Sequence, residues 1–311
     1  MKVVTTTKEA GITALGTFDG LHLAHQQIIA EARRWAAELA LPLSVLTFKE
    51  HPQKLWGNCP PLLMTLDEKI DFLAQLGVDN LLLLDFTPQI AALSDREFIA
   101  LLEDFGVCGA VVGYNYTFGR GGAAGPSILA DKAPFPVKVV PKVQVDGISV
   151  SSSRIREALA QGDVSLAAKL LGRPYSITGK VVHGAGRGRT LGIPTANIEP
   201  KKDILVPKAG VYIVKARGGT ICTRFAVLNL GPCPTFEQFH QTLEVFLPNW
   251  QGDLYGQLLT VEFLRYLRAQ RRFPTAGELQ AQIKLDLAEM EKEKDRCSGS
   301  GATHFSQFSS C

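Results

Sequence analysis

Two histidines stand three residues apart after a glycine-bracketed turn, in the stretch GTFDGLHLAH at residues 16–25. If a helix begins near His22, then His22 and His25 share one face of its first turn. The free N–H groups and the dipole of a helix start favour an anion, and Gly16 and Gly20 would let the backbone approach a bulky phosphate. No acidic residue or cysteine stands at a spacing that completes a metal site. The pattern suits a phosphate clamp, although HxxH alone is more often an ordinary surface or core feature.

Hydroxyl and guanidinium groups are concentrated in SSSRIR, at residues 151–156. Three serines at the start of a helix would offer hydroxyls and backbone N–H groups to an anion, and arginine suits bidentate phosphate contacts. In isolation, a plain serine cap with solvated arginines is the simpler interpretation. The run therefore becomes informative only in combination with the histidine pair.

A glycine-rich loop with one asparagine and three aromatic residues follows an apolar segment, as VGYNYTFGRGG at residues 112–122. Such a loop could close over a planar or ribosyl ligand. A flexible surface loop is an equally good reading of the same residues.

A second glycine-rich run, GKVVHGAGRGRTLGIPTAN, spans residues 179–197. Backbone N–H groups of a glycine loop flanked by basic residues can cradle phosphates. The run is not a Walker A loop, because His183 stands where the first glycine belongs, and no βαβ unit surrounds it as a dinucleotide fingerprint requires. The Thr195 hydroxyl and the Asn197 carbonyl are hard oxygens that suit Mg²⁺. Without those two residues, a glycine-rich hairpin would be an alternative.

The elements around the first motifs alternate between short apolar strands and amphipathic helices. This alternation predicts a parallel sheet covered on both faces, with ligands at the carboxyl ends of its strands. The loops at residues 16–20 and 113–125 lie at such ends. The expected strands cover residues 12–16, 43–48, 80–86 and 109–113, and the expected helices cover residues 22–39, 66–76, 96–105, 154–160 and 164–171.

The pattern changes near residues 172–174, where strands separated by turns replace the alternation. Strands without intervening helices predict a small antiparallel barrel. A charged amphipathic helix is expected at residues 275–291, with Leu279, Ile283 and Leu287 on one stripe. We therefore predict domains at residues 1–172 and 173–295 and a disordered Ser- and Gly-rich tail at residues 296–311. The expected barrel strands cover residues 175–182, 210–216, 224–230, 241–247 and 258–263.

The composition excludes several classes of protein. The 311 residues carry a formal charge of only +3, from 33 basic and 30 acidic residues, which does not favour nucleic acid or an anionic membrane as partner. The sequence contains no run of about eighteen apolar residues, so it predicts no membrane span. The first residues lack the apolar core of a secretory signal. The six scattered cysteines form no CxxC pair, which favours free thiols in a reducing cytoplasm.

The first three motifs together resemble the adenylyltransferase module of prokaryotic bifunctional riboflavin kinase/FAD synthetases, in the wider nucleotidyltransferase superfamily. The resemblance implies that His22 and His25 hold the ATP phosphates and stabilise the transition state. Ala24 stands where the family usually has glycine, and Ser153 where it usually has threonine. The other implied contacts to ATP or its phosphates are Gly16, Phe18, Asp19, Gly20, Asn115, Ser152, Ser153 and Arg156.

The run at residues 184–197 resembles the riboflavin kinase signature and is the most specific match in the chain. The resemblance implies that Glu244 accepts the proton of the riboflavin 5′-hydroxyl, whereas sequence alone would make it a solvent-facing strand residue. Asp253 is the weaker alternative for this base. Cys233 stands where the family usually has arginine. The implied nucleotide contacts are Gly184, Gly186, Gly188, Thr195 and Asn197, the last two also on Mg²⁺.

The resulting hypothesis is a bifunctional enzyme that phosphorylates riboflavin to FMN in a C-terminal barrel and adenylylates FMN to FAD in an N-terminal domain. Its fold would be a nucleotidyltransferase-like (Rossmann-like) parallel sheet followed by a riboflavin kinase barrel and a C-terminal helix. ATP would be co-substrate and Mg²⁺ the metal, with no tightly bound prosthetic group, no nucleic acid or membrane partner, and a cytoplasmic location. Two alternatives stay open: a riboflavin kinase with a degenerate adenylyltransferase domain, which Ala24 would permit, and a non-catalytic flavin-binding protein.

Overall fold

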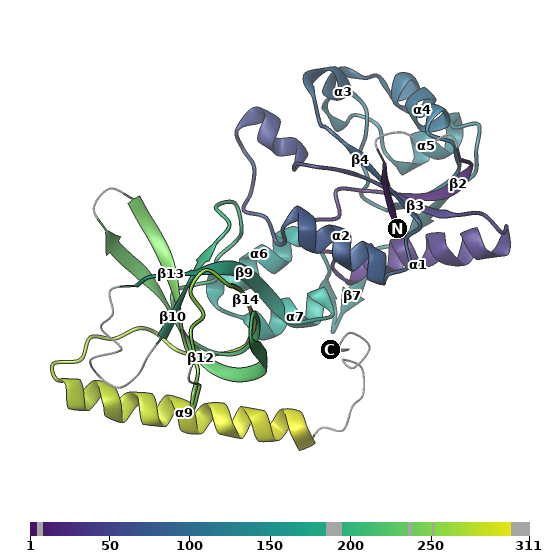
Figure 1. Ribbon diagram of the computed structural model, residues 1–311. Coiled ribbons are helices and arrows are strands. Elements are labelled where there is room, and N and C mark those ends of the chain that lie inside the picture. Colours follow the sequence, from purple (N-terminus) through teal and green to yellow (C-terminus); the bar gives the residue numbers. More distant parts are fainter. Residues whose placement is uncertain (5–8, 185–194, 236–237, 251, 300–311) are drawn as a thin grey trace. The chain divides into compact units, whose positions relative to one another are not determined.

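The structure of the chain is a computed structural model that describes residues 1–4, 9–184, 195–235, 238–250 and 252–299, without the side chains of residues 232–242 and 299 (Figure 1). The chain divides into two compact units, Met1–Arg154 and Ile155–Cys311. The division lies inside helix α6 (Ser152–Gln161), whereas the domain boundary predicted after residue 172 stays a prediction. In the ranges given above, no helix combines the length and the apolar run that crossing a bilayer requires.

A six-stranded sheet forms the centre of the N-terminal unit, and each of its strand pairs is parallel, as predicted. Its four central strands are largely apolar and buried because both faces of the sheet are covered. The sequence did not predict the two edge strands, β1 and β6, which are only three and four residues long. The spatial order is β1 (Lys2–Val4), β4 (Asn80–Leu84), β3 (Leu43–Phe48), β2 (Gly11–Leu15), β5 (Val107–Gly113) and β6 (Val137–Val140).

Helices cover the two faces of this sheet, and neighbouring residues of one strand contribute to opposite core clusters. Leu81 packs in the cluster that contains Trp35 of α1, whereas Leu82 packs in the cluster that contains Phe98 of α4. This alternation is the period of two that a strand imposes on its side chains. The helices are α1 (Leu23–Glu38), α2 (Leu66–Gln75), α3 (Pro88–Ala92), α4 (Asp95–Asp104) and α5 (Pro126–Lys132), and the short elements are η1 (Pro52–Trp56), η2 (Arg120–Gly122), β7 (Gln144–Val145) and β8 (Ile148–Ser149).

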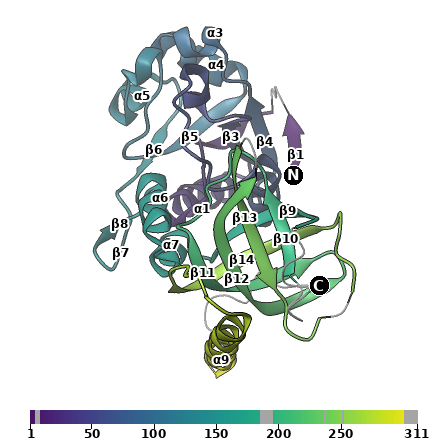
Figure 2. The same ribbon diagram turned by 90° about the vertical axis from the view of Figure 1, so that its left-hand side faces the viewer.

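The C-terminal unit is a closed antiparallel barrel of six strands, which confirms the predicted architecture (Figure 2). Strand β10 was not predicted, because its run TANIEP is polar and ends in proline. Helix α7 (Val164–Leu171) precedes the barrel. Around the barrel the strands are β10 (Thr195–Pro200), β13 (Gln238–Phe246), β12 (Ile221–Thr235), β11 (Gly210–Gly218), β14 (Leu258–Arg268) and β9 (Tyr175–Val182).

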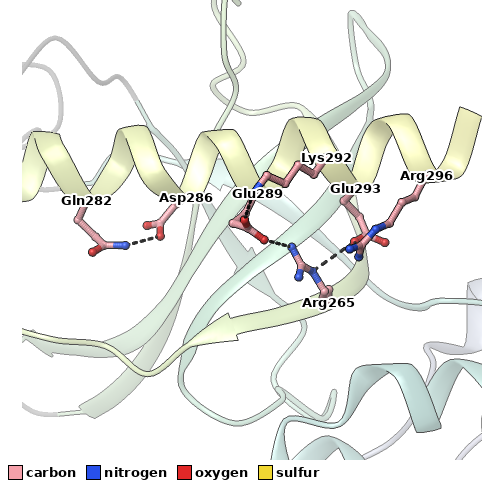
Figure 3. A network of polar contacts seen from close by, with 7 residues as sticks. All are labelled: Arg265, Gln282, Asp286, Glu289, Lys292, Glu293 and Arg296. Carbon is pink, nitrogen blue, oxygen red and sulfur yellow. Dashed lines mark hydrogen bonds and ion pairs between the residues drawn. The ribbon is translucent and has the colours of Figure 1, made fainter.

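Helix α9 (Ala276–Gly299) runs beside the barrel and is held by apolar and ionic contacts. Its most buried positions include polar Asp286 beside the predicted apolar stripe, because Arg268 binds this carboxylate in two hydrogen bonds of 3.0 and 2.7 Å. Arg265 reaches Glu289 and Glu293, as Figure 3 shows. Hydrogen bonds from Lys292, which has the larger effect, and from Arg265 lower the pKa of Glu289 to about 2. The helix continues through residues 296–299, which corrects the start of the predicted tail, and residues 300–311 lie outside the described ranges.

Candidate functional site

The turn between β2 and α1 has an unusual backbone. Phe18, Gly20 and Leu21 have φ angles of 50°, 79° and 42°, and the two non-glycine residues among them are fully buried. Residues other than glycine rarely adopt positive φ, so packing must hold the backbone of this turn in place. The buried Asp19 accepts a hydrogen bond from the Leu63 backbone N–H at 3.0 Å through its Oδ1 atom. The turn therefore fixes the backbone conformation at the start of α1.

His22 is the N-cap of α1, and its ring lies against that of His25. Its Nδ1 atom accepts a hydrogen bond from the His25 backbone N–H at 3.3 Å. The two imidazoles are stacked, with centroids 3.6 Å apart and planes 14° from parallel. Because Nδ1 is an acceptor, the neutral ring of His22 carries its proton on Nε2. The structure thus brings both predicted histidines to the first turn of one helix.

The surroundings of His25 favour its neutral form. Burial first, and then the neighbouring His22 and Lys69, lower its pKa well below the ordinary value. Its ring meets Phe18 edge-on at 5.2 Å, and within the described residues its buried Nδ1 atom has no hydrogen-bond partner. A buried polar atom without a partner calls for an explanation, and a bound ligand is one. His25 can offer hydrogen bonds to such a ligand, but little charge.

The serine run lies at the same turn. The Ser152 hydroxyl donates to the Asp19 carbonyl at 3.0 Å, and Ser151 caps α6 by accepting from the Arg154 N–H at 3.2 Å. Ser153 is exposed. Arg156 follows Ser152 by four residues in α6, a spacing that puts both on one face of that helix, although Arg156 belongs to the second unit.

Gly16 and Asn115 complete the predicted contacts of the N-terminal unit. A Cβ atom on Gly16 would lie 3.1 Å from the Phe18 ring, so a side chain there would crowd the turn. Asn115 is exposed and follows β5, the neighbour of β2 in the sheet. Because the strands are parallel, their carboxyl ends lie at the same end of the sheet. Asn115 and the histidine turn both lie at that end. Ala24 is half-buried in the first turn of α1.

A cationic residue that the sequence did not single out also reaches this turn. The Lys69 ammonium of α2 donates to the Thr17 carbonyl at 2.9 Å, and burial lowers its pKa to about 8 against the opposing effect of Asp19. A lysine on an amphipathic helix gives no sequence signal of such a role. A small pocket lies beside it, and residues 48–52 form part of its wall. The pocket is lined by Thr17, Asp19, Phe48, Lys49, Glu50, His51, Pro52, Leu62, Met64, Leu66 and Lys69.

In the barrel, Glu244 lies between two asparagines. The register pairs it with Asn197 of β10 on one side and with Asn229 of β12 on the other. Directly paired residues of antiparallel strands project from the same face, and Leu243 and Val245, on either side of Glu244, are fully buried toward the core. Asn229 Nδ2 donates to Glu244 Oε2 at 3.3 Å. Glu244 is therefore half-buried and held by a donor, unlike a solvated strand residue.

Thr195 and Asn197 share one face of β10, two residues apart. The Asn197 side chain leaves no room at Gly184, where a Cβ atom would lie 2.1 Å from Asn197 Nδ2. A hydroxyl, an amide oxygen and a nearby carboxylate are donors that fit Mg²⁺, which takes few protein ligands beside substrate phosphates. The part of the chain that the structure describes contains no group of three His, Cys, Asp or Glu residues arranged for a metal. Gly186, Gly188 and the Cys233 side chain lie outside the described residues.

The sequence also did not predict the neighbours of Glu244. Gln270 Nε2 donates to Asn229 Oδ1 at 2.8 Å, which leaves the Asn229 amide nitrogen to face Glu244. Gly231 is packed against this contact, since a Cβ atom there would lie 2.2 Å from Gln270 Nε2. These residues are ordinary polar positions in the sequence, and only the barrel register brings them together.

Comparison with known proteins gives a consistent result for both units. The FAD synthetase family matches residues 4–154 and the riboflavin kinase family matches residues 171–293. Bifunctional riboflavin kinase/FMN adenylyltransferases from Bacillus subtilis and Escherichia coli K12 are 37% and 34% identical over 288 and 287 residues, which cover 89% and 90% of this chain and 90% and 91% of theirs. A crystal structure described as a macrolide-efflux protein from Streptococcus pneumoniae superposes with a TM-score of 0.87 at 32% identity, covering 93% of this chain and 98% of that chain.

Proposed function

The chain belongs to the family of bifunctional riboflavin kinase/FMN adenylyltransferases, and from that premise we propose which of its residues carry each reaction. It phosphorylates riboflavin to FMN and adenylylates FMN to FAD, with ATP as substrate of both steps. Matches to both families, and to relatives that combine both activities, favour this function over a kinase with a degenerate first domain or a flavin carrier.

Adenylyl transfer needs no protein base, because the FMN phosphate is already an anionic nucleophile. It attacks the α-phosphorus of ATP, and pyrophosphate leaves. Catalysis then consists of placement and stabilisation of charge. The observation that supports His22 and His25 in this role is their stacked pair at a helix start, where burial favours the neutral form of His25 as a hydrogen-bonding group. The further contacts in this proposal are Gly16, Phe18, Asp19, Gly20 and Asn115 on ATP and Ser152, Ser153 and Arg156 on the departing pyrophosphate.

Phosphorylation of riboflavin does need a base, because the attacking group is a neutral hydroxyl. We assign this task to Glu244, supported by its register between Asn197 and Asn229. The Asn229 amide binds Oε2, which leaves Oε1 to accept the hydroxyl proton as the γ-phosphoryl group transfers. Thr195 and Asn197 would hold Mg²⁺, which when bound neutralises the phosphates of ATP. Gly184, Gly186 and Gly188 would face the nucleotide.

The decisive experiment uses the full chain and follows flavins by chromatography. Riboflavin with Mg·ATP should give FMN and then FAD. Glu244→Gln should lower FMN formation by about 10²- to 10⁴-fold, the usual effect of removing a general base, and leave FAD formation from supplied FMN unchanged. Glu199→Gln, an exposed glutamate on strand β10, is the matched control and should leave both reactions intact. A Glu244→Gln chain that still phosphorylates riboflavin, or that loses both reactions, contradicts the assignment.

The cellular setting follows from the chemistry. We expect the chain to act in the cytoplasm on small molecules, with riboflavin, FMN and ATP as its partners and without nucleic acid, a membrane or a tightly bound prosthetic group. The free state of Cys59, Cys108, Cys222 and Cys297 suits a reducing compartment. Fractionation of cells with antibody detection would test this location.

A further inference from the structure

Lys69 is a charged group that the scheme above does not use, and the fold holds it under unfavourable conditions. Its ammonium is removed from water, which lowers its pKa to about 8. It is the fourth residue of α2, close to the helix N-terminus, where the dipole disfavours a cation. It also lies near enough to His25 to depress the pKa of that ring. A cation retained against both burial and the helix dipole is a candidate for function.

The contacts of Lys69 converge on one backbone carbonyl. Lys69 Nζ donates to the Thr17 oxygen at 2.9 Å, and Thr47 Oγ1 donates to the same oxygen at 3.0 Å. Two donors fill the acceptor capacity of a carbonyl. Thr17 immediately precedes Phe18, the first residue of positive φ in the turn. The two hydrogen bonds therefore anchor the point from which the chain enters its strained conformation.

We propose, on the basis of the adenylylation proposed above, that Lys69 is a positioning residue for adenylyl transfer. Its ammonium holds the Thr17 carbonyl, and with it the turn that carries Asp19 and the stacked histidines toward the ATP phosphates. A bound polyphosphate also gives this cation a favourable partner. The charged ammonium thus stabilises the site when ATP is bound, although its burial destabilises the folded chain without ATP.

This role makes stability and activity respond to pH in opposite directions. The pKa of Lys69 is lowered from 10.5 to about 8 in the folded chain. Between these values the unfolded chain keeps a proton that the folded chain has lost, so this group makes the fold more stable as the pH rises. Deprotonation also removes a charge-assisted hydrogen bond to the turn and a positive charge near the phosphates. Adenylylation should therefore weaken over the range in which the fold gains stability.

Several other groups surround the ammonium and share its electrostatics. Asp19 is the carboxylate that raises the pKa of Lys69 against burial. The titratable and charged neighbours on the packed elements are Asp19, His22 and His25 on the turn and α1, Lys49, Glu50 and His51 after β3, and Asp67 and Glu68 on α2. A comparison of Lys69→Met with Lys69→Arg, which keeps the positive charge, separates the electrostatic contribution of Lys69 from those of these neighbours.

The test compares Lys69→Met and Lys69→Arg with native chain and with Lys142→Met, an exposed lysine of the same unit. FAD formation from FMN is measured beside FMN formation from riboflavin, and thermal unfolding midpoints are recorded. Lys69→Met should lower kcat/KM for FAD formation by about 10²-fold, the order expected for a misplaced reacting group. Its unfolding midpoint should equal or exceed that of native chain, and riboflavin phosphorylation should be unchanged. Lys69→Arg should recover at least about a tenth of native activity, because it keeps the charge.

The pH profile supplies a readout that a purely structural role would not move. Native kcat/KM for FAD formation should fall above about pH 8, the pKa of Lys69 in the free enzyme. Lys69→Arg should lack this fall, because a guanidinium stays protonated throughout the range. An alkaline limb that persists unchanged in Lys69→Arg overturns the proposal.

Two further outcomes overturn it. One is Lys69→Met with FAD formation within threefold of native chain. The other is Lys69→Met with a lowered unfolding midpoint and no recovery by arginine, which marks a structural lysine. Failure of the underlying function looks different: a native chain that forms no FAD from FMN and ATP rejects adenylylation itself, before any variant is compared.

Discussion

In the N-terminal unit the proposed phosphate contacts come from a helix start and the turn before it, whereas in the barrel they come from the faces of paired strands. The turn depends on a strained backbone that buried Phe18 and Leu21 hold in place. The barrel site depends on register, which puts Asn197, Glu244 and Asn229 in one row without such strain.

The chemistry explains the difference. Adenylyl transfer uses a nucleophile that is already charged, so its site needs hydrogen-bond donors and a cation, and we propose that a helix start and buried Lys69 provide them. Riboflavin phosphorylation uses a neutral hydroxyl, so its site needs a carboxylate in a fixed orientation, and amide neighbours can supply that. A variant that impairs only one of the two reactions would support this contrast, whereas a variant that impairs both would contradict it.

The largest effect is expected at His22, where helix capping and ligand binding can be separated. His22→Ala and His22→Asn both remove the imidazole and should lower FAD formation by about 10²- to 10³-fold. Asparagine is a good N-cap, so His22→Asn should unfold like native chain, whereas His22→Ala should lose about 1 kcal/mol of stability. Chromatography of flavins and denaturant unfolding measure the two effects. FAD formation that survives in His22→Asn would show that the ring is not used.

A smaller effect is expected at Gly184 in the barrel. Gly184→Ala places a methyl group against the Asn197 amide and should lower FMN formation by about 10- to 100-fold, because the proposed metal ligand moves. FAD formation from FMN should not change. Gly277→Ala is the matched control, since a Cβ atom there meets open space. Native rates of FMN formation in Gly184→Ala would argue against Asn197 as a ligand.

The smallest effects are expected at Asn229 and Gln270. Asn229→Ala should lower kcat for FMN formation about tenfold, the value of one hydrogen bond to a charged group. Gln270→Ala should cost about two- to threefold, because Gln270 only orients Asn229. The double variant should be no slower than Asn229→Ala, since both act through one contact. If the two effects multiply, Gln270 acts on the site by another route.

Most of the fold could be predicted because buried parallel strands and amphipathic helices have strong periodic signals. Strand β3 and helix α7 have the predicted bounds. Strand β10 was missed because its polar residues serve the site, and a pattern search reads them as a loop. Helix α9 was predicted with an apolar stripe, whereas Asp286 is buried through its ion pair with Arg268, which no spacing reveals.

The candidate sites divide in the same way. His22, His25 and Ser152 stand in short motifs whose spacing predicts a shared anion site, and the structure brings them to one turn. Lys69 and Asn229 occupy ordinary positions of a helix and a strand, so their contacts arise only when distant segments pack. The sequence therefore predicts site residues that are close together along the chain, but it does not predict residues that only tertiary packing brings to the site.

The strand edges of the two units have a consequence for association between chains. A closed barrel has no edge strand on which another chain could add a strand, whereas an open sheet always has two. Here the edges are β1 and β6, both very short and each with a lysine, Lys2 and Lys138. Short, charged edges resist strand addition, so the sheet should stay free of β-type aggregation while its apolar central strands remain covered.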